Sequence, residues 1–112
     1  MEKITITSEV ISYLDELIFI LYKKNYFSFI ENAEQYVINI YDFIETEIPL
    51  HNYRKTPKSL SKYGDFYIFY QSNARTTWYI FFSKKGFNYL IKHITNNHVV
   101  ESKFINQLNI KE

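Results

Sequence analysis

The chain of 112 residues contains no cysteine, only two glycines and only two prolines. The lack of cysteine excludes disulfides and thiolate metal sites, and it fits a reducing compartment. So few glycines exclude a glycine-rich loop of the kind that cradles phosphates. Residues 1–4 lack the basic and apolar pattern of a signal peptide, and the apolar runs are too short to cross a bilayer. We therefore expect a cytoplasmic protein without membrane contact.

Aromatic side chains are unusually abundant, with 11 tyrosines and 10 phenylalanines. Aromatic residues at this level favour strands and contact surfaces. A chain of this length can bury one hydrophobic core without a covalent staple. We therefore expect a single domain that spans residues 1–112.

The charges are divided between the two halves of the sequence. Residues 1–50 hold three basic and nine acidic side chains, a net charge of −6. Residues 51–112 hold ten basic and three acidic side chains, a net charge of +7. A small protein with one cationic half is a candidate for binding a polyanion such as RNA or DNA. The plainer alternative is that the lysines serve solubility alone.

The acidic half predicts a short strand followed by a helix. Residues 3–7 alternate polar side chains with isoleucine, which is typical of a strand. Thr7 or Ser8 can then cap a helix over residues 8–24. The apolar stripe of this helix, at helical spacing, consists of Val10, Leu14, Leu17 and Leu21, with Ile11 and Ile18 beside them.

A second helix is predicted to begin after Ser28. Ser28 and Glu31 form a capping box, in which a hydroxyl at the cap is followed three residues later by a glutamate. Pro49 stops this helix. Its apolar stripe consists of Ile30, Ala33, Val37, Ile40 and Ile44. Only a few residues join the two helices, so we expect them to lie antiparallel as a hairpin.

The basic half predicts an antiparallel meander behind a polar loop at residues 51–64. Three aromatic or β-branched runs, separated by short polar breaks, cover residues 65–71, 76–83 and 88–95. The residues expected to face the core are Ile68, Tyr70, Trp78, Ile80, Phe82, Leu90 and Ile94. The tail at 101–109 is expected to form a weak last helix. The fold class is therefore α+β, in which an N-terminal short strand and a helix hairpin pack on a mostly antiparallel four-stranded sheet.

Three stretches of the basic half carry a resemblance to a known family. They are residues 62–70, with Gly64 at the start of a strand; residues 78–82; and residues 89–94, which Asn96, Asn97 and His98 follow. With the order strand, helix hairpin, basic loop and meander, they resemble the RelE/ParE superfamily of bacterial toxins over nearly the whole chain. The resemblance implies that fold, and a toxin of the plasmid-stabilization kind that a cognate antitoxin encoded beside it neutralises.

Members of this family either cut messenger RNA on the ribosome or poison DNA gyrase. From the resemblance and the cationic half we expect a metal-free, ribosome-dependent mRNA endoribonuclease that uses no cofactor. Tyr67 occupies the place where the family commonly has an arginine that helps to bind or cleave RNA. This difference favours the alternative of a non-catalytic, ParE-like inhibitor of gyrase. A third alternative is a degenerate member that acts only by binding a protein.

Cleavage of RNA requires a base for the 2′-hydroxyl, cations for the phosphorane and an acid for the leaving oxygen. Because imidazole titrates near neutral pH, His98 and, after it, His93 are the candidate proton carriers. Arg75 completes the catalytic candidates, because a guanidinium can grip a phosphate through two hydrogen bonds. The candidates for substrate binding are Arg54, Lys55, Lys58, Lys62, Tyr63, Tyr67, Lys84 and Lys85. The spacing of the histidines gives no zinc motif.

These candidates also have a plainer interpretation. The cations can form a solvated surface, and the aromatic side chains can pack in the core. His93 lies on a predicted strand and can be a packed histidine. On one continuous strand His93 and His98 would face opposite ways, being five residues apart. For the functional interpretation we expect the basic loop and the later strands to converge into one positively charged hollow that receives RNA or the antitoxin.

Overall fold

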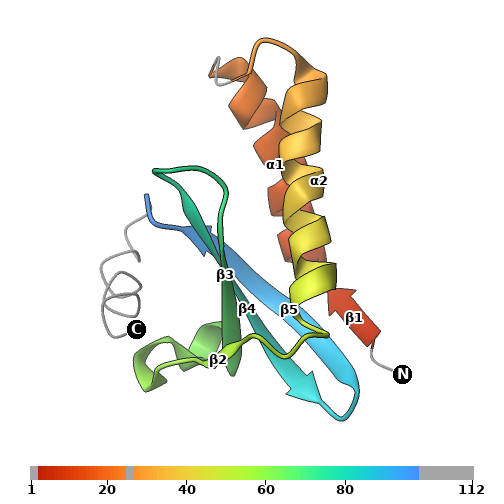
Figure 1. Ribbon diagram of the computed structural model, residues 1–112, viewed down its shortest axis with the longest axis vertical. Coiled ribbons are helices and arrows are strands. Elements are labelled where there is room, and N and C mark those ends of the chain that lie inside the picture. The colour runs from red at the N-terminus through yellow and green to blue at the C-terminus, as the bar shows by residue number, and fades with distance from the viewer. Residues whose placement is uncertain (1–2, 25–26, 99–112) are drawn as a thin grey trace.

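The computed structural model describes residues 3–24 and 27–98. Its elements are β1 (Lys3–Ile6), α1 (Ser8–Lys23), α2 (Ile30–Glu47), β2 (Arg54–Lys55), the 3-10 helix η1 (Lys58–Tyr63), β3 (Phe66–Gln71), β4 (Thr77–Lys85) and β5 (Asn88–Asn96). The strands form one sheet in the order β1-β5-β4-β3-β2. β1 runs parallel to β5, and the other neighbours are antiparallel. The two helices lie together on one side of this sheet (Figure 1).

The α+β class, the helix pair and the three-strand meander are therefore confirmed, whereas the expected four strands are wrong. The sheet has five strands and is mixed. The additional strand, β2, lies within the predicted basic loop, where Arg54 and Lys55 pair with Tyr67 and Phe66 through the backbone. The predicted tail helix at 101–109 lies outside the described residues. No helix in the described part of the chain is long and apolar enough to cross a bilayer.

The helices begin and end close to where the sequence predicts, with one different cap. The Thr7 hydroxyl accepts a hydrogen bond from the Val10 N–H at 3.4 Å and so caps α1. The predicted capping box at Ser28 is wrong, because α2 starts one residue later, with extended Phe29 at the cap and no side-chain bond. α2 ends before Pro49, whose ring cannot continue it.

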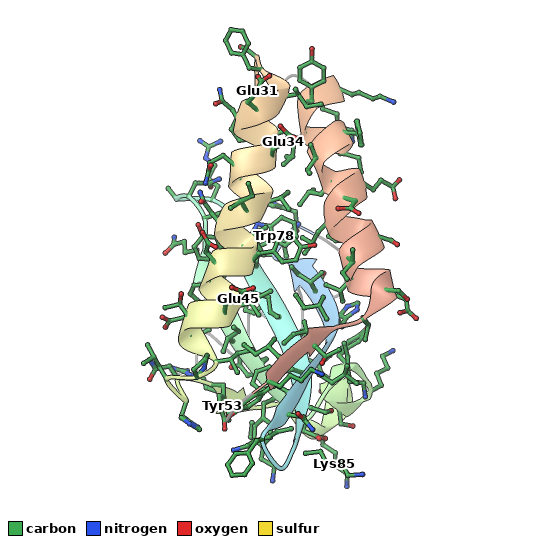
Figure 2. The ribbon with its side chains drawn as sticks, turned by 90° about the vertical axis from the view of Figure 1, so that its right-hand side faces the viewer. Glu31, Glu34, Glu45, Tyr53, Trp78 and Lys85 are labelled. Carbon is green, nitrogen blue, oxygen red and sulfur yellow. The ribbon has the colours of Figure 1, made fainter. Side chains whose placement is uncertain are left out.

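The main core lies between the helix pair and the sheet. Its buried members are Val10, Leu14, Leu17, Val37, Ile40, Ile44 and Ile48 from the helical part and Ile68, Trp78, Ile80, Phe82, Tyr89, Ile91 and Ile94 from the strands. Figure 2 shows Trp78 between α1 and α2. Its ring meets that of Tyr13 with centroids 6.3 Å apart, and its indole N–H donates to the Tyr36 hydroxyl at 2.8 Å. This bond satisfies the one polar atom of a buried indole.

A bulge between β4 and β5 explains the one core residue that was predicted wrongly. Phe81 pairs with His93 but Phe82 pairs with Ile91, so β5 carries an additional residue at this point. The bulge reverses the alternation of β5, and Ile91 and Ile94 both reach the main core. Leu90, which strict alternation placed in the core, is 40% exposed instead.

A second, smaller cluster covers the opposite face of the sheet. Its buried members are Leu60, Tyr67, Tyr79 and Phe81, with Tyr63 and Phe69 packed against them. Gly64 lets η1 fold back onto this face. Its φ is +153°, and a Cβ there would lie 2.7 Å from the Phe82 nitrogen and 2.8 Å from its oxygen. Only a residue without a side chain allows the backbone to approach β4 so closely.

Candidate functional site

The turn between β3 and β4 is held in one conformation by Asn73. The Asn73 side-chain oxygen accepts the N–H groups of Arg75 at 2.8 Å and Thr76 at 3.0 Å. The Ser72 N–H donates to the Thr76 carbonyl at 3.0 Å and closes the turn. An asparagine side chain that bonds the following backbone in this way is a common device for fixing a turn. The exposed side chain of Arg75 therefore projects from an ordered support.

Asn97 joins the end of β5 to this turn. Its side-chain oxygen accepts the Thr77 N–H at 3.0 Å, and its side-chain nitrogen donates to the Arg75 carbonyl at 3.0 Å. The Asn97 N–H also donates to the Thr77 carbonyl at 3.2 Å. Asn97 thus continues the pairing of β4 with β5 beyond the last strand residue.

His98 completes the arrangement. Its Nε2 lies 3.1 Å from the Thr76 hydroxyl, and its backbone N–H donates to the Asn96 side chain at 2.8 Å. The imidazole is exposed, so it can exchange a proton with a bound molecule while Thr76 fixes its orientation. We call residues 73–77 and 96–98 the turn site. Two of the three residues predicted to be catalytic, Arg75 and His98, lie in it.

A partly buried hydrogen-bond chain connects the turn site to α2. The Tyr36 hydroxyl lies 2.7 Å from the Ser72 hydroxyl and accepts from Trp78 at 2.8 Å. The Ser72 hydroxyl donates in turn to the Thr76 carbonyl at 3.4 Å. These bonds connect the turn to the helix layer as well as to the sheet.

His93, the other predicted proton carrier, has different surroundings. Its ring stacks on that of Tyr63, with centroids 4.2 Å apart and planes at 12°, and Phe81 lies 6.0 Å away. Nε2 of His93 is buried. Five extended residues span about 16 Å, so His93 and His98 do not form one acid–base pair. The geometry supports the interpretation of His93 as a packed histidine.

The candidates from the basic loop lie on β2 and η1. The Arg54 guanidinium lies 5.4 Å from the centre of the Phe69 ring, and Lys62 Nζ lies 5.0 Å from that of Tyr63. Such contacts hold cations against aromatic faces. Tyr67 is only 3% exposed and packs on Phe81, so in this structure it cannot stack on a base. Lys55 and Lys58 are exposed on the same elements.

Lys84 and Lys85 lie at the other end of β4. Lys84 Nζ is 5.4 Å from the centre of the Tyr89 ring, and Lys85 lies in the part of Figure 2 farthest from Glu31 at the start of α2. β4 spans about 26 Å from Thr77 to Lys85 at the usual rise of a strand. The expected single cationic hollow is therefore not formed. The cations occupy three places: the turn site, β2 with η1, and the β4–β5 hairpin.

The residues that build the turn site were not predicted from the sequence. Asn73, Thr76 and Asn97 make its bonds, and only their residue types gave a signal, since asparagine is frequent in turns. Within the described ranges, no three His, Cys, Asp or Glu side chains gather as a metal site would require. No family model, curated protein or solved structure matches this chain.

Proposed function

We propose that the chain is a RelE/ParE-like toxin of a toxin–antitoxin pair and that it cleaves ribosome-bound messenger RNA. The architecture supports this proposal: a helix pair covers one face of a sheet whose three-strand meander is joined at its edge by the N-terminal strand. Support from the resemblance lies in residues 78–82 and 96–98, which contribute Trp78 to the core and His98 to the turn site.

The observation that carries the proposal is that Arg75 and His98 belong to one hydrogen-bonded support. In this reaction His98 takes the proton of a ribose 2′-hydroxyl, and the oxygen attacks the adjacent phosphorus. Arg75 binds the non-bridging oxygens, whose charge grows in the transition state. The bond to the 5′-oxygen breaks, and the protonated imidazole returns its proton to that oxygen. The products carry a 2′,3′-cyclic phosphate and a 5′-hydroxyl.

Purified protein mixed with ribosomes and a defined message tests this reaction. We expect cleavage by the native chain and a loss of about 100-fold or more for His98→Ala and for Arg75→Gln. Lys23→Gln removes an exposed cation of α1 and is the matched control for charge. His51→Asn removes another exposed imidazole, at a φ of 60° that asparagine tolerates, and is the matched control for the ring. No cleavage by the native chain, or equal rates for all four variants, would refute the proposal.

Two observations favour a second function, the inhibition of DNA gyrase without catalysis. Tyr67, at the position where the family commonly has a functional arginine, is buried in the second cluster. The candidate cations are spread over three places, as a broad protein-binding surface would allow. A supercoiling assay carried out beside the cleavage assay separates the two functions. Inhibition of gyrase without cleavage of the message would support the second.

A further inference from the structure

Thr76 and His98 lie opposite each other just beyond the end of the ladder between β4 and β5. The last strand pair joins Trp78 to Asn96, so continuing this register by two residues on each strand sets Thr76 opposite His98. The Thr76 hydroxyl lies 3.1 Å from Nε2 of the imidazole. The register of the sheet thus brings one particular nitrogen of the ring to this hydroxyl.

Backbone hydrogen bonds hold both partners of this contact. The Thr76 N–H donates to the Asn73 side-chain oxygen at 3.0 Å, and the Thr76 carbonyl accepts the Ser72 N–H at 3.0 Å. On the other side, the His98 N–H donates to the Asn96 side-chain oxygen at 2.8 Å. Side-chain oxygens that bond the backbone in this way fix local conformation. The hydroxyl and the imidazole therefore both extend from a supported backbone.

The two ring nitrogens of His98 have different surroundings. Nε2 contacts the Thr76 hydroxyl, whereas no group in the described part of the chain bonds to Nδ1. A hydroxyl can donate to a ring nitrogen or accept from it, so the contact alone fits either neutral tautomer. A general base needs a nitrogen that carries no hydrogen and that the substrate can reach. Nδ1 meets both conditions if the hydrogen of the neutral ring lies on Nε2, which then donates to Thr76.

We propose that Nδ1 of His98 transfers the proton and that Thr76 is a positioning residue that keeps the other hydrogen on Nε2. The inference rests on the proposed function. Nδ1 takes the proton of the 2′-hydroxyl as the oxygen bonds to phosphorus. It returns this proton to the 5′-oxygen as the bond from that oxygen to phosphorus breaks. Nε2–H donates to Thr76 throughout, so the ring keeps one orientation during both transfers.

Replacement of His98 by Nδ1-methylhistidine in the full chain tests which nitrogen transfers the proton. The methyl group blocks Nδ1 and leaves Nε2 able to accept a hydrogen bond from the Thr76 hydroxyl. We expect cleavage of ribosome-bound message to fall at least about 100-fold, as it does for His98→Ala. Cleavage within about threefold of the native rate would show that Nε2 transfers the proton, and would overturn the proposal.

Thr76→Val tests the positioning role, because it removes the hydroxyl and keeps the branched shape of the side chain. We expect kcat to fall about tenfold, the effect of one lost hydrogen bond, with KM unchanged within about twofold. Thr76→Ser keeps the hydroxyl and is the matched control, expected to retain kcat within about threefold. A merely structural role would lower the free energy of unfolding without this separation of kcat from KM. Equal kcat values for the two variants would contradict the role of Thr76.

Nuclear magnetic resonance of the ring nitrogens needs no cleavage and so separates this inference from the proposed function. The signals of His98 are those that His98→Ala removes. We expect the hydrogen of the neutral ring on Nε2 in the native chain, and a mixture of both tautomers in Thr76→Val. Hydrogen on Nδ1 in the native chain would overturn the inference even if the chain cleaves message. A chain that carries the hydrogen on Nε2 but cleaves no message would refute the proposed function, and this inference with it.

Discussion

His93 and His98 are five residues apart, yet different forces fix their side chains. The ring of His93 is stacked on Tyr63 at 4.2 Å on the second face of the sheet, where Phe81 also contacts it. The ring of His98 is exposed and is oriented by the hydroxyl of Thr76. Stacking fixes a ring by covering it, whereas a hydrogen bond at the end of a strand fixes a ring and leaves it accessible.

The comparison separates a structural environment from a reactive one. A proton carrier must reach its substrate within hydrogen-bonding distance, so accessibility is required in addition to a suitable residue type. The turn site meets this requirement because its bonds run mostly between side chains and backbone, beneath the exposed groups of Arg75 and His98. The second cluster instead consists mostly of packed aromatic rings, and we expect changes in it to lower the free energy of unfolding.

Exchange of the two histidines for alanine gives the largest expected difference. His98→Ala should lower the rate of message cleavage by about 1000-fold and leave the free energy of unfolding nearly unchanged. His93→Ala should lower the free energy of unfolding by about 2 kcal/mol, because it deletes a stacked ring and leaves a cavity. Its rate of cleavage should change less than about threefold. Cleavage assays and urea denaturation of both variants measure these two effects. A loss of stability in His98→Ala together with a loss of cleavage in His93→Ala would contradict the comparison.

Gly64→Ala tests how the second cluster is held. The new Cβ would meet the backbone of Phe82 at a φ of +153°, so both a clash and backbone strain are introduced. We expect a loss of about 3 kcal/mol in the free energy of unfolding, measured with urea. Gly86→Ala is the control, because its φ is 61° but no atom lies within 4 Å, and it should cost about 1 kcal/mol. Equal losses would show that the approach of η1 to β4 is not tight.

Much of the fold was predictable because its signals are local. The 3.6-residue spacing of Val10, Leu14 and Leu17 specified α1, and the hydroxyl of Thr7 specified its start. The aromatic runs specified the three meander strands. β2 was missed because two basic residues, Arg54 and Lys55, carry no apolar alternation and pair through the backbone alone. The core position of Leu90 was wrong because a bulge cannot be read from residue types.

The turn site was predictable in part. The chemistry of the side chains indicated Arg75 and His98, but not that both would belong to one hydrogen-bonded turn. Their placement depends on register, with Trp78 opposite Asn96 after the bulge has shifted β5 by one residue. The distances between the expected cations likewise follow from strand length, which separates Arg75 from Lys85 by the whole of β4. Properties of residue type could thus be predicted, whereas properties of long-range pairing could not.

Asn97→Ala sharpens the comparison by loosening the support of the turn site without touching its exposed groups. The change removes two hydrogen bonds. The Asn97 side-chain oxygen accepts one from the Thr77 N–H, and its side-chain nitrogen donates the other to the Arg75 carbonyl. We expect a loss of about 1–2 kcal/mol in the free energy of unfolding and a fall of about tenfold in cleavage. Asn97→Asp keeps the acceptor and should give an intermediate result. If cleavage by Asn97→Ala is normal, the support does not position Arg75 and His98.

The ionisation of Tyr41 involves neither histidine, and its expected effect on stability is the smallest of those considered. Burial, and secondarily the carboxylate of Asp15, raise the pKa of Tyr41 above its ordinary value of 10.0. The folded chain therefore holds this proton more tightly than the unfolded chain, so the contribution is complete below about pH 10 and is lost as the pH rises through the raised pKa. Tyr41→Phe should make the urea midpoint less sensitive to pH between about pH 9 and pH 11. Asp15→Asn should do so more weakly, because burial is the larger cause, and an unchanged alkaline slope in both variants would assign the transition to another tyrosine.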